Sequence, residues 1–246
     1  MTTSVAVVGA TGKLGQLVTR IVREEDDFEL VAALDSKADL SRVLGVDIVV
    51  DVTLPAASQG IVDYAVENGI NVVVGTSGWT SQRIASLENR VAARGDVGVI
   101  IIPNFSLGSV LATTLSTIAA RLFESIEIVE THSSSKVDSP SGTAVRTAEL
   151  MGAARGALGP VAAPHTDQRA RGQQVSSIPV HSLRLQGVLA RQDVIFGGTG
   201  ETLTISHETI SSSSYEAGIL VALRAAREAR GVTVGLDKLI ELGPTA

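Results

Sequence analysis

One short segment of the chain combines a proton donor, a cation and the sequence of a helix start. His132 and Lys136 are separated by three serines, and Ser139–Thr143 (Ser-Pro-Ser-Gly-Thr) follows closely. Serine caps a helix well and proline suits its first turn, so we expect a helix to begin here. The free N–H groups and the dipole of a helix N-terminus attract a carboxylate or phosphate, and Lys136 adds a positive charge. Because imidazole can transfer a proton near neutral pH, the segment predicts an enzyme that acts on a small acid. Taken alone, it fits equally well a solvated loop before an ordinary capped helix.

The N-terminal residues carry a second motif, which is typical of dinucleotide binding. The apolar run Val5–Val8 ends in Gly9–Gly15 (Gly-Ala-Thr-Gly-Lys-Leu-Gly), and an amphipathic stretch continues to about Glu25. A strand, a glycine-rich turn and a helix in this order predict a Rossmann βα unit, since the glycines permit the turn and the close approach of a pyrophosphate. A turn that binds no nucleotide is the alternative. The residues expected to contact the cofactor in this turn are Gly9, Thr11, Gly12, Lys13 and Leu14.

The next predicted strand, Glu29–Leu34, ends in an acidic residue, Asp35. A carboxylate about 20 residues after the glycine turn can accept hydrogen bonds from the adenosine ribose. Its charge would repel a 2′-phosphate and so favours NADH, but Lys13 and Lys37 are near enough in sequence to weaken that repulsion. We therefore predict NADH or NADPH as the cofactor, with loose selectivity between them.

Three further apolar runs are predicted to be parallel strands of the same sheet: 47–53, 71–74 and 98–102. In an open parallel sheet, ligands bind just beyond the carboxyl ends of the strands. The cofactor contacts expected at these ends are Thr53, Gly75, Ser77, Pro103, Asn104 and Phe105. For any single one of them, an ordinary place in a βα loop is nearly as good an interpretation.

The second half of the chain changes its pattern. A strand over 126–131 precedes the His132–Thr143 loop and a helix, and 155–176 has the composition of a long loop. Three runs separated by short glycine turns then predict an antiparallel meander: 178–185, 188–196 and 202–207. A sheet with few covering helices must bury its other face, which favours contact with a second subunit. A helix over 215–230 and a short segment, 236–242, are expected to return to the first domain.

Together these patterns predict an α/β fold with two domains. One is a Rossmann-type dinucleotide-binding domain, formed by 1–105 and 214–246, and the other is an α+β domain over 106–213 with a mostly antiparallel sheet. We expect the second domain to bind the substrate and to make the subunit contacts. The sequence contains no internal repeat.

Composition narrows the function classes. The chain has 246 residues, of which 44% are hydrophobic and only 3% aromatic, so its core is expected to be aliphatic. A net charge of −6 argues against nucleic acid as the main partner. Without cysteine there is no disulfide, thiolate catalysis or cysteine-bound metal, and no apolar run approaches the ~20 residues of a membrane span. We expect a cytoplasmic protein that binds neither membrane nor nucleic acid. The remaining histidines lack a metal-ligand spacing and are interpreted as structural or surface residues: His165, His181 and His207.

Taken in order, the motifs resemble the 4-hydroxy-tetrahydrodipicolinate reductase family, long called dihydrodipicolinate reductases. The resemblance runs through nearly the whole chain. Its most specific string is Lys136–Ala144 (Lys-x-Asp-x-Pro-Ser-Gly-Thr-Ala), which few other nucleotide-binding proteins would carry beside the same loops. The other segments that resemble the family are Gly9–Gly15, 51–55, 74–79, 103–106, 130–132, 196–197 and 200–202.

The resemblance implies a homotetramer that reduces a small cyclic dicarboxylate with NADH or NADPH, in diaminopimelate and lysine biosynthesis. The residue matching His132 is then the proton donor, and the residue matching Lys136 assists it and binds a carboxylate. The other implied substrate contacts are Ser133, Ser141, Gly142 and Thr143.

The serine run departs from the family pattern, in which a second histidine follows the first and a third often precedes the lysine. Ser133 stands where that second histidine contacts a substrate carboxylate. A serine offers one hydrogen bond and no charge, so we expect the exchange to cost ~1–3 kcal/mol of substrate binding. Two alternatives stay open: a related dehydrogenase that acts on another small imino or amino acid, and a non-catalytic protein that senses nicotinamide. The retention of both His132 and Lys136 argues against the sensor.

Overall fold

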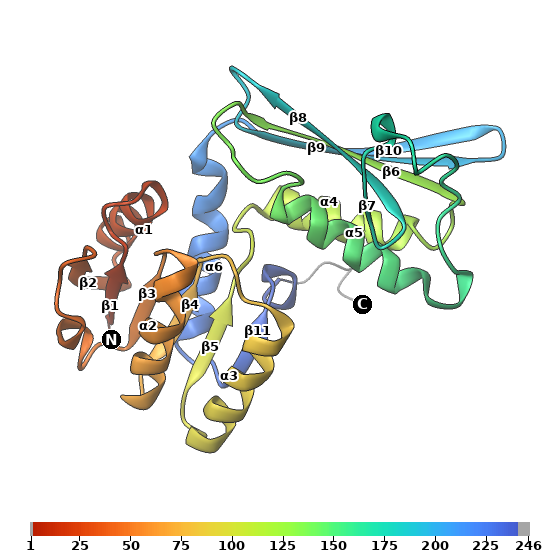
Figure 1. Cartoon of the computed structure of the whole chain (residues 1–246). Coiled ribbons are helices and arrows are strands. Elements are labelled where there is room, and N and C mark those ends of the chain that lie inside the picture. The colour runs from red at the N-terminus through yellow and green to blue at the C-terminus, as the bar shows by residue number, and fades with distance from the viewer. Residues whose placement is uncertain (1, 241–246) are drawn as a thin grey trace. The chain divides into compact units, whose positions relative to one another are not determined.

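The computed structural model describes residues 2–240, which form two compact units (Figure 1). The first unit comprises the residues before Gly108 and those from Tyr215 onward, and the second comprises Gly108–Ser214. Each unit has its own sheet and its own largely aliphatic core. The predicted α/β fold, with one Rossmann-type sheet and one mostly antiparallel sheet, is confirmed.

The first unit is built on a parallel sheet with the spatial order β11-β5-β4-β3-β1-β2. Its strands are β1 (Thr3–Val8), β2 (Phe28–Leu34), β3 (Ile48–Asp51), β4 (Asn71–Val74), β5 (Gly98–Ile101) and β11 (Gly231–Val234). The central strands are buried on both faces, which explains why they are continuous runs of valine and isoleucine. Strand β11 was missed in the sequence, because four residues that begin with glycine become a strand only by pairing with β5.

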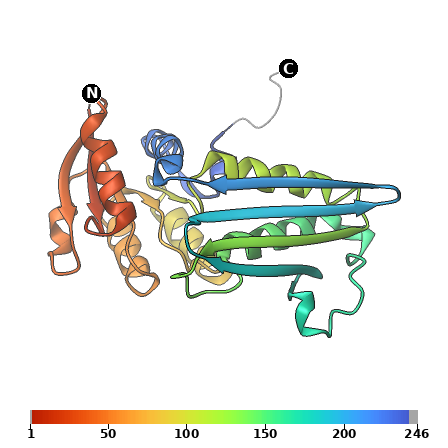
Figure 2. The same ribbon diagram turned by 90° about the horizontal axis from the view of Figure 1, so that it is seen from above.

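Helices cover this parallel sheet on both faces, as Figure 2 shows from above. They are α1 (Lys13–Glu24), α2 (Pro55–Glu67), α3 (Ser81–Arg94) and α6 (Glu216–Ala226). Helices α2 and α3 share one aliphatic core with the strands, whereas α1 and α6 contact each other. The result is the layered arrangement in which strand ends are left free to bind a ligand.

The second unit pairs a mixed sheet with two helices. The sheet has the order β10-β9-β6-β8-β7, and every neighbouring pair except β6 and β8 is antiparallel. Its strands are β6 (Ser125–Ser133), β7 (Gln173–Val175), β8 (Ile178–Leu185), β9 (Ala190–Gly198) and β10 (Glu201–Thr209). Helices α4 (Leu107–Ala119) and α5 (Gly142–Arg155) lie along one face of the strands (Figure 1).

The predicted meander is wrong in its first hairpin. Strands β9 and β10 do pair as neighbours, but β8 and β9 do not, because β6 lies between them and pairs with both. The glycine turn at Gln186-Gly187 therefore joins strands that are not adjacent. Local sequence patterns indicate where strands begin and end, but not which strands pair. Strand β6 has nine residues with buried isoleucines at alternate positions, and its packing places it in the centre of the sheet. The long predicted loop also contains β7 and two short 3-10 turns, Gly156–Leu158 and Arg169–Arg171.

Strand β6 changes its character along one face. Ile126 and Ile128 are buried in the core beneath α5, and Glu130 and His132 continue the same face because side chains alternate along a strand. The face that packs against α5 is therefore apolar at one end of β6 and polar at the other. The polar end is where the predicted proton donor lies.

Candidate active site

The predicted cofactor residues of the first unit gather at one edge of the parallel sheet. Register brings the last residues of five strands into one row: Leu34, Val8, Asp51, Val74 and Ile101. The loops that follow these residues all begin at the same edge, and they contain the residues predicted to contact the cofactor except Lys13 and Leu14, which are the first residues of α1. This is the place at which open parallel sheets bind their ligands.

The glycine turn after β1 has the geometry that close approach of a phosphate requires. Gly9 has a φ of +91°, and the N–H groups of Gly9 and Ala10 donate to the Leu34 carbonyl at 2.9 and 3.0 Å. A Cβ on Gly9 would lie 2.5 Å from the Val52 carbonyl oxygen, and one on Gly15 would lie 2.0 Å from the Gly9 carbonyl oxygen. Helix α1 begins after Gly12 without a side-chain cap. The turn and the N–H groups of the first helical residues therefore fit a pyrophosphate.

A buried carboxylate organises the neighbouring loops. Asp51 is fully buried, and its side chain accepts hydrogen bonds from the Thr53 hydroxyl at 2.6 Å and from the Ser58 hydroxyl. Ser58 Oγ in turn accepts from the Trp79 indole at 3.0 Å, and Thr76 Oγ1 accepts from the Thr53 N–H at 2.8 Å. The loops after β3 and β4 are thus tied together. Asp51 was not among the predicted site residues, although an aspartate at the end of an apolar strand was a signal for a structural or functional role.

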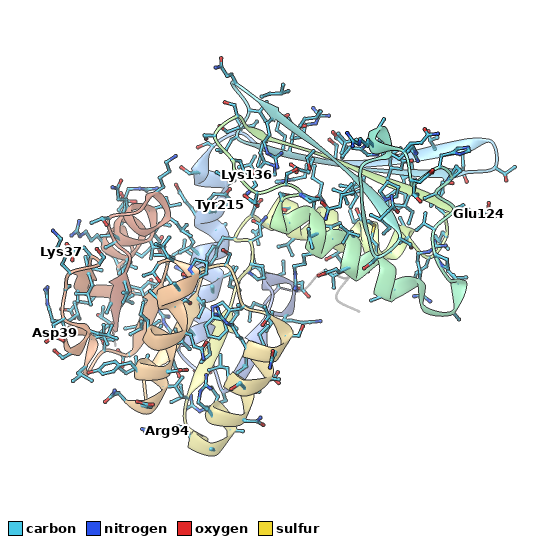
Figure 3. All side chains as sticks on the ribbon, in the orientation of Figure 1. Lys37, Asp39, Arg94, Glu124, Lys136 and Tyr215 are labelled. Atoms are coloured by element: carbon cyan, nitrogen blue, oxygen red, sulfur yellow. The ribbon has the colours of Figure 1, made fainter. Side chains whose placement is uncertain are left out.

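Asp35 is exposed at the end of β2, and its Oδ1 accepts the N–H of Lys37 at 2.9 Å. Figure 3 shows the Lys37 and Asp39 side chains together on this side of the first unit. Asp35 and Lys37, the residues with opposite expected effects on the choice between NADH and NADPH, therefore lie in the same turn.

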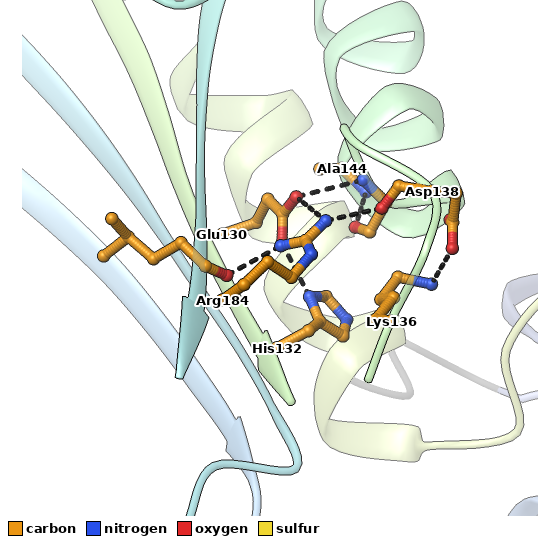
Figure 4. A network of polar contacts seen from close by, with 8 residues as sticks. Glu130, His132, Lys136, Asp138, Ala144 and Arg184 are labelled. Carbon is orange, nitrogen blue, oxygen red and sulfur yellow. Dashed lines mark hydrogen bonds and ion pairs between the residues drawn. The ribbon is translucent and has the colours of Figure 1, made fainter. Parts of the chain in front are cut away.

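In the second unit, the polar end of β6 is a compact hydrogen-bonded network around Glu130 (Figure 4). The guanidinium of Arg184, from β8, spans both carboxylate oxygens, with Nη1–Oε2 and Nη2–Oε1 distances of 2.9 Å each. His132 Nδ1 lies 2.6 Å from Oε2, and the N–H of Ser141 donates to Oε1 at 3.1 Å. Glu130 has no exposed side-chain surface, while His132 keeps 16% of its own. The buried carboxylate is thus out of reach of a ligand, whereas the imidazole and the Arg184 side chain, which is 20% exposed, are not.

The electrostatics of the network fix the proton on His132. Burial raises the pKa of the Glu130 carboxyl, but hydrogen bonds from Arg184, Ser182 and His132 outweigh it and leave that pKa below its ordinary value. Glu130 is therefore a carboxylate at neutral pH and can only accept hydrogen bonds. His132 must donate to it through Nδ1–H, which leaves Nε2 as the nitrogen available to a ligand.

A helix begins where the sequence predicted one, but Pro140 precedes the cap and is not part of the first turn, because the helix starts only at Gly142. Ser141 caps α5, its hydroxyl accepting the Ala144 N–H at 3.2 Å, and Gly142 and Thr143 are the first helical residues. A Cβ on Gly142 would meet nothing within 4 Å, so this side of the helix start is open to a ligand. Lys136 Nζ lies 2.7 Å from Asp138 Oδ1, an ion pair that lowers the pKa of Asp138.

Ser133 lies apart from this network. Its hydroxyl is 3.0 Å from that of Ser135, and it follows His132 on a strand whose neighbouring side chains point to opposite faces. The structure thus brings together His132 and the Ser141–Thr143 helix start through Glu130, with Lys136 in the connecting loop, but does not bring in Ser133.

Two members of the network were not predicted as site residues, Glu130 and Arg184. An acidic residue at an inward position of a half-buried strand was a signal for Glu130, since a buried carboxylate needs partners. Nothing in the local sequence marks Arg184, which is 54 residues away along the chain.

Comparison with known proteins places both units in one family. Residues 3–105 match the family model of dihydrodipicolinate reductase, N-terminus, and residues 108–240 match that of dihydrodipicolinate reductase, C-terminus. The chain belongs to the dihydrodipicolinate reductase family. The resemblance drawn from the motifs is confirmed, as is the prediction of a reductase of this family that depends on a nicotinamide dinucleotide.

Individual dihydrodipicolinate reductases match over nearly the full length. The 4-hydroxy-tetrahydrodipicolinate reductase of Clavibacter sepedonicus is 70% identical over 242 residues, which are 98% of this chain and 87% of that protein. The reductase of the same name from Streptomyces griseus is 45% identical, over 97% of this chain and 98% of that protein. The dipicolinate-bound dihydrodipicolinate reductase from Paenisporosarcina sp. TG-14 superposes with a TM-score of 0.83 at 29% identity, covering 98% of this chain and 100% of that one.

Over residues 2–240, no cluster of three or more His, Asp or Glu side chains is placed to hold a metal ion. Within the same residues, no helix has both the length and the apolar character that a membrane crossing requires.

Proposed function

We propose that this chain reduces 4-hydroxy-tetrahydrodipicolinate to tetrahydrodipicolinate with NADH or NADPH, in diaminopimelate and lysine biosynthesis. The reaction adds a hydride and a proton to the ring, and the hydroxyl leaves as water. The observation that carries the proposal is the hydrogen bond from His132 Nδ1 to the buried Glu130 carboxylate, beside an open helix start. A bound nicotinamide supplies the hydride, and the residues of this chain bind the acid and deliver the proton.

The two carboxylates of the proposed substrate have two different partners. One is held at the start of α5 by the N–H groups of Gly142 and Thr143, where the helix dipole favours an anion. The N–H of Ser141 donates to Glu130, so Ser141 can contact this carboxylate only through its hydroxyl. The other exchanges with Asp138 at the ammonium of Lys136. An anionic ligand that replaces Asp138 keeps the Lys136 ammonium paired, and the displaced Asp138 carboxylate, whose side chain is 59% exposed, is solvated by water.

His132 is the proposed proton donor. Because Nδ1–H is held by Glu130, the ring gives and takes its second proton at Nε2. The ring is partly exposed next to the helix start and the lysine loop, which is where a ligand held by both would lie. Lys136 assists by balancing negative charge on the ligand as the proton moves.

Cofactor selectivity is proposed to be loose. Asp35 accepts ribose hydroxyl groups and favours NADH, while Lys13 and Lys37 offer positive charge to a 2′-phosphate. The remaining proposed cofactor contacts are those of the common strand-end edge: Gly9, Thr11, Gly12, Leu14, Thr53, Gly75, Ser77, Pro103, Asn104 and Phe105.

The serine run supports a second candidate, a related dehydrogenase that acts on another small imino or amino acid. The Ser133 hydroxyl pairs with Ser135 and not with the Glu130 network, so the carboxylate contact implied by the family pattern is weak here. A substrate with a single carboxylate would not require a carboxylate contact from Ser133.

Assembly and localisation are proposed on the family resemblance: a cytoplasmic homotetramer. The sheet face opposite α4 and α5 supports subunit contact, since Leu183, Leu185 and Ile195 on it are each at least 38% exposed. Light scattering of the purified chain tests this, and a monomer would contradict it.

The proposed reaction is tested by a coupled assay with freshly generated substrate, run with NADH and with NADPH. We expect measurable turnover with both cofactors, KM values for the two within about tenfold of each other (a gap of ~1.4 kcal/mol), and a raised KM for the substrate. Turnover of other cyclic imino acids but not of this one would favour the second candidate. No turnover of any of them, with nicotinamide binding intact, would reject both.

A further inference from the structure

The Glu130–Arg184 pair makes more hydrogen bonds than are needed to hold the imidazole of His132. Both guanidinium nitrogens that face Glu130 are in fork geometry at 2.9 Å, and the carboxylate also accepts from His132 and from the Ser141 N–H. Such a fork has little freedom to rotate, because two parallel hydrogen bonds fix its plane. The other two partners of Glu130, His132 and the Ser141 N–H, are therefore hydrogen-bonded to a carboxylate whose position is fixed.

The pair reaches all three segments that the proposed chemistry uses. Glu130 holds the imidazole of His132 at the end of β6 and the N–H of Ser141, the cap of α5. Arg184 Nη2 also donates to the backbone carbonyl of Asp138, at 2.6 Å, in the loop that carries Lys136. One buried ion pair thus connects the proton donor, the carboxylate-binding helix start and the loop of the second carboxylate partner.

The charges within this network are balanced. The charged groups that face His132 are Glu130 on its own strand, Arg184 on β8 and, in the following loop, Lys136 with Asp138. Arg184 pairs with Glu130 and Asp138 pairs with Lys136, so the contact of His132 with Glu130 is a hydrogen bond at Nδ1 to a carboxylate that already has a cationic partner. The carboxylate can therefore fix which ring nitrogen faces it.

We infer that Glu130, held by Arg184, is a positioning residue that sets the imidazole tautomer of His132 and fixes the ring relative to the carboxylate-binding helix start. The inference deepens the proposed function and rests on it for its catalytic meaning. The tautomer of His132 and the position of its ring can be measured in the ligand-free protein, so they do not depend on the identity of the substrate.

The tautomer is measured first, by ¹⁵N imidazole NMR of the full chain, which has only four histidines. Wild-type protein is expected to show His132 with its proton on Nδ1. In Glu130→Gln the amide can donate to Nδ1, so the Nε2–H form should become populated. The matched control is Glu127→Gln, three residues earlier on β6 and bonded to His181 and not to His132. An Nε2–H form of His132 already in the wild type, or no change in Glu130→Gln, would overturn the inference.

Ligand binding is measured second, by calorimetry with dipicolinate and separately with NADH. Glu130→Gln should weaken dipicolinate binding by about tenfold or more and lower kcat by at least about tenfold, while NADH, whose proposed contacts lie in the other unit, binds unchanged. If Glu130→Gln also loses NADH and is therefore misfolded, Arg184→Lys keeps the charge but not the fork and should still weaken dipicolinate. If a folded Glu130→Gln variant with a changed His132 tautomer bound dipicolinate as tightly as the wild type, Glu130 would not position the ring relative to the helix start.

The two proposals fail in different ways. If the wild type turns over no substrate but His132 shifts tautomer only in Glu130→Gln, the proposed reaction is wrong and the positioning role stands. If the wild type turns over and Glu130→Gln matches it in tautomer, kcat and binding, the reaction stands and the positioning role is wrong.

Discussion

Two glutamates three residues apart on β6 each bind one arginine and one histidine, on opposite faces of the same sheet. Glu130 binds Arg184 and His132 on the face that packs against α5, and Glu127 binds Arg171 and His181 on the other face. The side chain of Glu127 is 33% exposed and that of Glu130 not at all. The same three residue types therefore occur in two very different environments.

The difference lies in what surrounds each cluster. Around Glu130 the next partners are the cap of α5 and the carbonyl of Asp138, which belong to the segments that bind the proposed substrate. Around Glu127, Arg171 donates instead to the carbonyl of Pro164, so this cluster fastens the long loop to the sheet. The histidines also differ in the ring nitrogen that is hydrogen-bonded to the glutamate: Nδ1 in His132 and Nε2 in His181. We propose that the Glu130 set acts in catalysis because it is joined to the start of α5 through the Ser141 N–H, whereas the Glu127 set holds a loop.

The largest effect is expected from removing the two imidazoles in turn. His132→Ala should lower kcat by roughly 10²–10⁴-fold with a modest change in KM, because a proton donor is lost and the carboxylate contacts are kept. His181→Ala should leave kcat within about twofold, since His181 contacts only the loop-fastening cluster. Steady-state kinetics of the two variants on the same substrate make the comparison. Equal losses in both would mean that the two clusters do not differ in function.

A smaller effect is expected from restoring a charge next to His132. Ser133→His should lower the KM for the proposed substrate by roughly tenfold and leave kcat near its wild-type value, because an imidazole extends further from the end of β6 than the serine hydroxyl and, partly protonated, attracts a carboxylate. Ser134→His, at the neighbouring exposed position, is the control and should change neither parameter. A KM that rises in Ser133→His would indicate that the serines shape a pocket for a different acid.

The smallest effect concerns stability at the outer cluster. Burial raises the pKa of Glu127, but hydrogen bonds from Arg171 and His181 outweigh it and leave that pKa below its ordinary value. A carboxyl with a lowered pKa stabilises the fold above its unfolded pKa of about 4.3 and loses that contribution as the pH falls through the lower folded value. Glu127→Gln should therefore reduce the free energy of unfolding by ~1 kcal/mol or less at pH 7, and by progressively less below about pH 4.

Urea unfolding of both proteins at pH 7 and at pH 3.5 measures this difference. Glu130→Gln in the same experiment should lose more, since it leaves the Arg184 guanidinium, whose side chain is only 20% exposed, without its partner. A larger loss from Glu127→Gln than from Glu130→Gln would reverse the assignment of the two clusters.

What the sequence predicted well is what local chemistry dictates. The glycines at 9, 12 and 15 require a tight turn, and the valine runs beside them fit buried parallel strands, so the cofactor edge followed from the order of motifs. The helix start at Ser141 was equally local, because capping involves residues only three apart.

What it did not predict depends on pairing between distant segments. Glu130 and Arg184 meet only because β6 pairs with β8, and the predicted hairpin at Gln186-Gly187 put β8 beside β9 instead. With that register unknown, the partner of a buried glutamate could not be named. The hydrogen bond between the Ser133 and Ser135 hydroxyls was likewise not predicted.

The most direct test of the account is a crystal structure of the protein with NADH and dipicolinate bound. We predict one carboxylate within roughly 3.2 Å of the N–H groups at Gly142 and Thr143, the other on the Lys136 ammonium in place of Asp138, and His132 Nε2 facing the ring. Glu130 should keep its hydrogen bonds to His132 and Ser141 in that complex. Dipicolinate bound away from the α5 start, or His132 turned so that Nε2 meets Glu130, would contradict the account.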